Sequence, residues 1–326
     1  MTRETQILEI ISRRFPQNYE GIVVGIGDDA AITRIEGSAV VSASDLAVEG
    51  VHFTREWSTP WEIGARVCAA NCADIFSMGA QPRYLLVSMV IPDSISLSEL
   101  DEIALGIADE ARAAGAHVVG GDISAGSILM ISIAAFGYPV NEKIEDGRFL
   151  RSNATPGESI VLSNLTGRSR MGYEILKSGR EDLIHDYSAF VAQFKKPRVD
   201  YNFVRKIMMG PVGACIDVSD GLLSELGRIA SASGVDIEIS PEFWKELPEW
   251  DEVERLSSEL KLSPEEMVLT GGEDHAFIVT TSFPSMMGGI TIGKVISRGS
   301  EQSNEDFIIH MGHKRFTKDS LLGYRH

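Results

Sequence analysis

Residues 21–48 read GIVVGIGDDAAITRIEGSAVVSASDLAV and decide the fold of the first half of the chain. Positions 25–30 match the G-x-G-x-x-A fingerprint of dinucleotide-binding folds, and Asp45 stands where that fingerprint expects an acid for the ribose. That fold needs a crossover helix before the next strand, and the segment 30–39 is too short to hold one. We therefore exclude a dinucleotide site and interpret the stretch as strand, acidic turn and strand.

Two capping boxes mark long helices after this stretch. Residues 59–62, Thr-Pro-Trp-Glu, predict a helix that runs to about Met78, and residues 96–99, Ser-Leu-Ser-Glu, predict a second that ends near Gly115. Strands are then expected on either side of Gly-Gly-Asp at 120–122. Strands and helices in this mixed order are typical of an α+β domain.

Residues 137–157 contain prolines, glycines and mixed charges with little periodicity, so they are the candidate domain boundary. The sequence predicts an α+β domain over 1–148, beginning with a helix over 5–15. Strand and helix patterns then alternate over 149–326, which predicts an α/β layered domain.

The composition excludes several classes of protein. A formal net charge of −17 disfavours nucleic acid and anionic membranes as partners, because both are themselves negatively charged. The three cysteines, Cys68, Cys72 and Cys215, form no C-x-x-C pair and indicate neither a disulfide framework nor a zinc site. The longest apolar run, 128–138, is too short to span a bilayer. We expect a cytoplasmic protein.

Short acidic motifs recur at expected strand ends and turns. If several of them converge, unit charges about 4 Å apart repel by roughly 4 kcal/mol at an effective dielectric of 20, so the cluster requires bound cations or raised pKa values. Oxygen ligands without His or Cys partners select Mg²⁺, and Mg²⁺ suggests phosphates. The motifs are Gly27-Asp28-Asp29, Ser44-Asp45, Asn71-x-x-Asp74, Gly120-Gly121-Asp122, Asp217-x-Ser219-Asp220-Gly221 and Gly271-Gly272-Glu273-Asp274.

The order and spacing of these motifs resemble the thiamine-monophosphate kinase family over nearly the whole chain. The segments that carry the resemblance are GIGDDAA at 25–31, DLAVEGVHF at 45–53, NCADIFSMGA at 71–80, GGD at 120–122, DVSDGL at 217–222 and GGED at 271–274.

The resemblance implies a fold and a reaction. The fold is that of the aminoimidazole-ribonucleotide-synthetase superfamily, with an α+β N-terminal domain whose mixed or antiparallel sheet pairs across a homodimer and an α/β layered C-terminal domain. The reaction transfers the γ-phosphoryl group of ATP directly to thiamine monophosphate and yields thiamine diphosphate and ADP. The acceptor is a phosphate oxygen that is already deprotonated, so no general base is required and Mg²⁺ ions supply alignment and charge neutralisation.

The resemblance also implies roles for individual residues. The expected metal ligands are Asp29, Ser44, Asp45, Asp74, Asp122, Asp217 and Asp220. The expected ATP contacts are Gly121, Asp122, Arg151 and Ser219. The expected contacts to thiamine monophosphate are His52, Glu273 and Tyr324.

The chain departs from the family pattern at three places. Ala43 replaces a hydroxyl residue, Ala125 replaces an arginine, and His275-Ala276 replaces Tyr-Glu. Two alternatives to the thiamine enzyme remain open: another ATP-using member of the superfamily, similar to aminoimidazole-ribonucleotide synthetase, and a catalytically degenerate nucleotide-binding protein.

Overall fold

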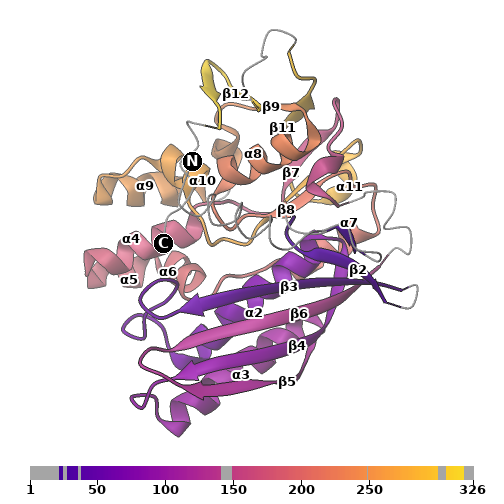
Figure 1. Ribbon diagram of the computed structural model, residues 1–326. Helices are drawn as coiled ribbons and strands as arrows, with labels where there is room; N and C mark the ends of the chain where they lie inside the picture. The colour runs from indigo at the N-terminus through magenta and orange to yellow at the C-terminus, as the bar shows by residue number, and fades with distance from the viewer. Residues whose placement is uncertain are drawn as a thin grey trace.

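The computed structural model describes residues 22–24, 28–35, 38–140, 149–247, 249–299 and 306–318. The helix expected over 5–15 lies outside these residues. Two β-sheets with helices against them make up the described chain (Figure 1). Within the described residues, no helix is both long enough and apolar enough to cross a membrane.

The first sheet has six strands in the order β1-β2-β3-β6-β4-β5. Neighbouring strands run antiparallel except β4 and β5, which are parallel, so the mixed sheet expected for this half is confirmed. The strands are β1 (Ile22–Val24), β2 (Ala31–Ile35), β3 (Ser38–Val48), β4 (Ala80–Ile91), β5 (His117–Ala125) and β6 (Met130–Pro139). Because strand β2 directly follows the acidic turn and pairs with β1, a crossover helix is absent at this described position.

Helices α2 (Pro60–Ser77) and α3 (Leu97–Ala114) lie together behind one face of this sheet (Figure 1). Both begin with the predicted capping boxes, at Thr59 and Ser96. A Cβ atom on Gly64 would lie 2.1 Å from the Ile103 carbonyl oxygen, so glycine lets the two helix backbones touch there. The packing of the two helices fixes the position of helix α2, which carries Asn71 and Asp74 of the candidate site.

The prediction that strands flank Gly-Gly-Asp at 120–122 is wrong, because strand β5 runs straight through these residues. Gly121 lies opposite Val87 of β4, and a Cβ at Gly121 would lie 1.7 Å from the Val87 carbonyl oxygen. A register shift between Leu85 and Leu86 accompanies this close approach. The glycines therefore mark a point where two strands crowd together, and not a turn.

The second sheet has seven strands in the order β13-β12-β9-β11-β7-β10-β8. They are β7 (Ser159–Leu162), β8 (Cys215–Asp217), β9 (Asp236–Ile239), β10 (Phe277–Thr281), β11 (Ile290–Ile296), β12 (Ile309–Met311) and β13 (Lys314–Phe316). The predicted layering of strands and helices is present, but only the β9–β12 pair is parallel.

Helices surround this second sheet (Figure 1). The α-helices are α4 (Arg168–Ser178), α5 (Glu181–Asp186), α6 (Ser188–Lys195), α7 (Tyr201–Met208), α8 (Leu222–Ser233), α9 (Trp250–Leu260), α10 (Pro264–Thr270) and α11 (Pro284–Met287). Short 3-10 helices occupy η2 (Arg151–Asn153) and η3 (Phe243–Glu246).

The two hydrophobic cores do not divide neatly at the expected boundary of 148/149. The first core, built on Phe76, Ile131 and their neighbours, also contains Phe203 and Phe277 from the second half of the chain. The two halves therefore share buried apolar surface, and the end of strand β8 is held close to helix α2. The boundary itself stays a prediction.

Candidate metal centre and adjoining cleft

Three aspartates from separate parts of the chain converge at the junction of the two sheets. Asp29 precedes strand β2, Asp74 lies in the last turns of helix α2, and Asp217 ends strand β8. One carboxylate oxygen of each lies within 4.8 Å of the others. Asp217 is only 2% exposed. The three were predicted as metal ligands from a resemblance, and the fold brings them together.

Burial and mutual repulsion disfavour the charged forms of Asp29 and Asp74. Burial raises the pKa of Asp29 and of Asp74 well above the usual range, and the neighbouring carboxylates raise both further. Burial also raises the pKa of Asp45, while nearby His275 lowers it. The Asp29 Oδ2 atom is buried and has no hydrogen-bond partner. Hard oxygen donors with an unsatisfied lone pair fit a divalent cation such as Mg²⁺.

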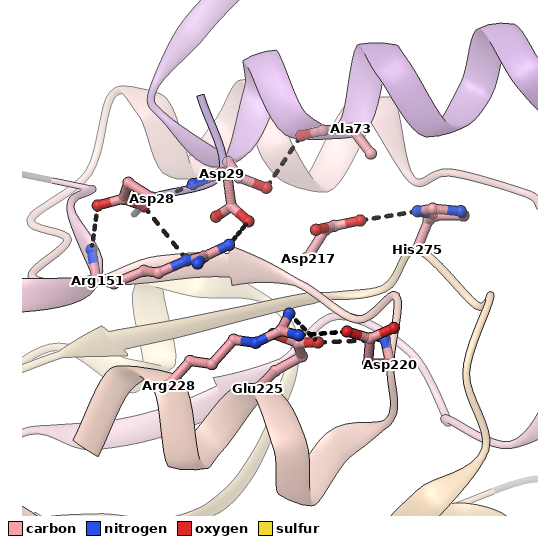
Figure 2. Close-up of polar contacts among 10 residues, drawn as sticks. Asp28, Asp29, Ala73, Arg151, Asp217, Asp220, Glu225, Arg228 and His275 are labelled. Atoms are coloured by element: carbon pink, nitrogen blue, oxygen red, sulfur yellow. Dashed lines mark hydrogen bonds and ion pairs between the residues drawn. The ribbon is translucent and has the colours of Figure 1, made fainter. Parts of the chain in front are cut away.

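Cationic and polar side chains contact the carboxylates from outside the group (Figure 2). Arg151 pairs with Asp29 and with Asp28, at 3.3 Å for the latter. His275 places its Nδ1 atom 2.7 Å from Asp217 Oδ2. Asp220, in the turn after strand β8, pairs with Arg228. The predicted ligands Asp29, Asp217 and Asp220 are therefore each oriented by a second residue.

A cleft of about 210 Å³, called here the central cleft, adjoins the group. Strand β3 contributes Asp45, whose backbone N–H donates to Asn71 Oδ1 at 3.0 Å. The facing wall carries Ser219, Asp220 and Glu273. Residues expected to contact metal, ATP and acceptor thus line one cavity between the two halves of the chain.

The loop 271–276 is pinned to the loop after strand β8. The Glu273 N–H donates to the Ser219 carbonyl at 2.7 Å, and the His275 N–H donates to the Val218 carbonyl at 2.9 Å. Glu273 and His275 both have left-handed backbone conformations, with φ of 65° and 49°. Non-glycine residues hold this conformation only where the surroundings impose it.

Asp274, between Glu273 and His275, anchors the loop to helix α4. Its carboxylate accepts the backbone N–H groups of Gly167 and Ser169, at 2.5 and 2.8 Å, and so caps helix α4 from a distance. Burial raises the pKa of Asp274 to about 7. The loop is anchored by this buried carboxyl group and turns the Glu273 and His275 side chains toward the central cleft.

His52 stands at the mouth of the cleft, in the turn after strand β3. Its Nδ1 atom accepts the Val48 backbone N–H at 3.1 Å. The neutral ring therefore carries its proton on Nε2. His52 lines both the central cleft and a second cavity of about 550 Å³.

The sequence of this chain is similar to those of curated thiamine-monophosphate kinases. The protein from Mycobacterium tuberculosis strain H37Rv is 33% identical over 277 residues, which cover 84% of this chain and 80% of the relative. The protein from Methanocaldococcus jannaschii is 30% identical over 326 residues, which cover 93% of this chain and 97% of the relative. This chain belongs to the thiamine-monophosphate kinase family.

Two further comparisons agree with this family. Residues 27–138 match the family model for the N-terminal domain of AIR synthase related proteins. The solved structure of AaThiL complexed with AMPPCP and TMP superimposes with a TM-score of 0.82 at 25% identity, over 99% of this chain and 96% of that one. The chain therefore has the AIR-synthase-like fold and is a kinase.

Ser44, Gly121 and Asp122 belong neither to the three converging aspartates nor to the lining of the central cleft. Asp45 lies opposite buried Ile133, so it faces the helices, whereas its neighbour Ser44 points to the other face of the sheet. Asp122 lies opposite Ser88 and shares that outer face, and Gly121 lies beside it on edge strand β5. Tyr324 lies outside the described residues. The roles of all four stay predictions.

Several residues of this kinase-family site were missed by the sequence reasoning. Arg66 of helix α2 is buried, pairs with Glu273 at 2.7 Å and lines the central cleft. A single arginine in the otherwise apolar run 63–70 was a signal that went unused. Glu225 and Arg228 gave no such signal, because their spacing is ordinary for a helix surface.

Proposed function

We propose that this chain transfers the γ-phosphoryl group of ATP to the phosphate of thiamine monophosphate, with magnesium held by Asp29, Asp74 and Asp217. The observation that carries the proposal is the convergence of these three carboxylates, from both halves of the chain, beside a cleft that holds candidate substrate contacts. Carboxylates placed this way would hold Mg²⁺, and the bound ions would offset the negative charge of ATP and thiamine monophosphate.

Different residues of the site have different roles in the reaction. A phosphate oxygen of the acceptor attacks the γ-phosphorus, the bond to the β–γ bridging oxygen breaks, and ADP leaves. Magnesium supplies charge neutralisation at the transferred group. Asp45 and Asp220 line the adjoining cleft and would supply further oxygen ligands to the ions, and Arg151, beside Asp29, would stabilise a phosphate. The acceptor oxygen needs no base, and its alignment is the main task of the cleft.

A direct assay tests this function. Purified protein with ATP, MgCl₂ and thiamine monophosphate is expected to form thiamine diphosphate and ADP in equal amounts, and free thiamine is expected to remain unphosphorylated. EDTA should abolish the reaction. Intact ATP binding without any turnover would favour the degenerate nucleotide-binding alternative instead.

We further propose that the protein is a homodimer that pairs through the first sheet. Figure 1 shows helices α2 and α3 behind this sheet, with its other face open. Leu46, Tyr84 and Leu86 on that open face are exposed, as is Ile123 on edge strand β5. An apolar face beside a long unpaired edge is typical of a buried interface. Ser44 and Asp122 would then lie at this interface.

Light scattering after size exclusion tests the dimer. The wild-type protein is expected at about twice 35.6 kDa, and Leu86→Glu is expected to shift it toward the monomer. Leu105→Glu is the control, because Leu105 is exposed on helix α3, away from that face. A monomeric wild-type protein would contradict the proposal. Because ATP is the donor, we also propose that the enzyme works in the cytoplasm.

A further inference from the structure

Two side chains of helix α8, Glu225 and Arg228, form a closed network with Asp220 (Figure 2). Arg228 Nη1 donates to both carboxylate oxygens of Glu225, at 2.9 Å each, and Arg228 Nη2 donates to Asp220 Oδ2. The Asp220 backbone N–H donates to Glu225 Oε1 at 3.2 Å. The Glu225 side chain is 0% exposed. A buried carboxylate that accepts two hydrogen bonds from one guanidinium gives Arg228 a fixed position.

The backbone at Asp220 is fixed as well. Gly221, which follows it, has a φ of 104°, and a Cβ atom there would lie 2.7 Å from the Thr270 carbonyl oxygen. The turn is therefore held between the end of helix α10 and the Glu225 carboxylate. Only the side-chain torsions of Asp220 remain to be set, and Arg228 sets them because it binds Oδ2.

Two other expected metal ligands are held in the same way. Arg151 pairs with Asp29 Oδ1, and His275 Nδ1 lies 2.7 Å from Asp217 Oδ2. In each pair the partner holds one carboxylate oxygen, and the second oxygen of Asp29, Oδ2, is buried without a hydrogen-bond partner. Chelation of an ion by one carboxylate requires both of its oxygens to face that ion. A carboxylate with one oxygen already held therefore offers a single oxygen to a cation.

This restriction distinguishes Mg²⁺ from Ca²⁺. Ca²⁺ takes roughly six to eight oxygens in flexible geometry and binds carboxylates through one or both oxygens, whereas Mg²⁺ demands near-octahedral geometry. We infer that Arg228 is a positioning residue that favours Mg²⁺ over Ca²⁺ by holding Asp220 to one coordinating oxygen. This inference rests on the proposed function, in which Asp220 is a ligand of the bound ions. The Asp220 side chain is 33% exposed and lines the central cleft, so an ion can reach it.

Competition for bound Mn²⁺ tests the inference without a measurement of activity. Electron paramagnetic resonance measures free Mn²⁺ over the protein with AMPPCP, and titration with Mg²⁺ or Ca²⁺ gives the ratio of their two apparent dissociation constants. Glu225→Gln is the reference, because the buried carboxylate is then neutral and does not lose an ionic partner when Arg228 is replaced. Adding Arg228→Met is expected to lower the preference for Mg²⁺ about tenfold. The lost positive charge acts on both divalent ions alike and cancels in the ratio.

The controls identify the residue through which Arg228 acts. With Glu225→Gln and Asp220→Asn present, adding Arg228→Met should leave the ratio within twofold, because an amide offers only one oxygen. Arg112→Met, which breaks an exposed i,i+3 pair on helix α3, is the matched control and should leave the ratio unchanged. If Arg228→Met lowers the preference for Mg²⁺ by less than twofold, or lowers it equally with Asp220→Asn present, the inference fails. If the wild-type protein with AMPPCP holds no more Mn²⁺ than AMPPCP alone, the metal centre of the proposed function fails instead.

Discussion

The imidazole of His275 lies 2.7 Å from the carboxylate of Asp217, through Nδ1 and Oδ2, and both side chains are almost fully buried. Asp217 is one of the three converging carboxylates, so this contact fixes how it is presented to a cation. A histidine that orients a ligand carboxylate acts on the metal without touching it.

Removing this contact should weaken metal use more than folding. We expect His275→Phe to raise the Mg²⁺ concentration for half-maximal rate about 10- to 100-fold, because Asp217 loses the partner that holds its orientation. The measurement is the initial rate against Mg²⁺ at saturating substrates. His313→Phe, at an exposed histidine far along the chain, is the matched control. An unchanged Mg²⁺ dependence in His275→Phe would remove this role.

Asp74→Asn separates catalysis from stability. Burial and the charges of Asp45, Asp217 and Asp29 raise the pKa of Asp74, so a neutral amide at this position removes a source of repulsion in metal-free protein. The thermal midpoint in EDTA should therefore stay level or rise, while activity falls by at least a hundredfold. Scanning calorimetry in EDTA gives the thermal midpoint, and the rate of thiamine diphosphate formation in Mg²⁺ gives the activity. Asp251→Asn, at an exposed helical position, should alter neither. A large loss of stability in EDTA would argue against crowded carboxylates.

The stability of metal-free protein should fall as pH rises through neutrality. Burial raises the pKa of Glu225 from 4.5 to about 7, although Arg228 opposes the shift. A group whose pKa is raised by folding stabilises the protein fully below its unfolded value, and this contribution is lost as pH rises through the folded value. Through Glu225 the free energy of unfolding falls by about 3 kcal/mol between pH 4.5 and 8.

Denaturant unfolding in EDTA across this range measures the effect. Glu225→Gln should flatten the part of the profile that belongs to Glu225, while Asp274, whose pKa is also about 7, and the carboxyl groups of Asp29 and Asp74, whose pKa values are also raised, keep the remaining slope. Glu259→Gln, at an exposed position on helix α9, is the control. A wild-type profile that rises from pH 5 to 8 would contradict the assignment.

Local sequence signals predicted the two long helices of the first half, and their ends, well. The capping boxes at Thr59 and Ser96 depend only on residues three positions apart, and both are present. The strand through Gly120-Gly121-Asp122 was missed because its reason is non-local: glycine there is required by the Val87 backbone of another strand. Adjacent turn residues give no hint of such an approach.

The site was only partly open to prediction for the same reason. Asp29, Asp74 and Asp217 each belong to a short acidic motif, and their role as metal ligands was predicted from the resemblance of these motifs to the family. Arg66 and the anchoring of loop 271–276 by Asp274 depend on contacts more than a hundred residues apart in sequence. Ser44 and Asp45 lie on opposite faces because strand β3 runs through both, and the register of β3 with β6 fixes which of them faces the helices.

The central claim is that carboxylates from both halves of the chain share bound divalent ions. A crystal structure with AMPPCP, thiamine monophosphate and Mn²⁺, analysed for anomalous scattering, tests it most directly. We expect at least one manganese peak at bonding distance, about 2.2 Å, from oxygens of Asp29, Asp74 and Asp217. Manganese bound only elsewhere, with these three carboxylates unligated in the presence of both substrates, would contradict the account.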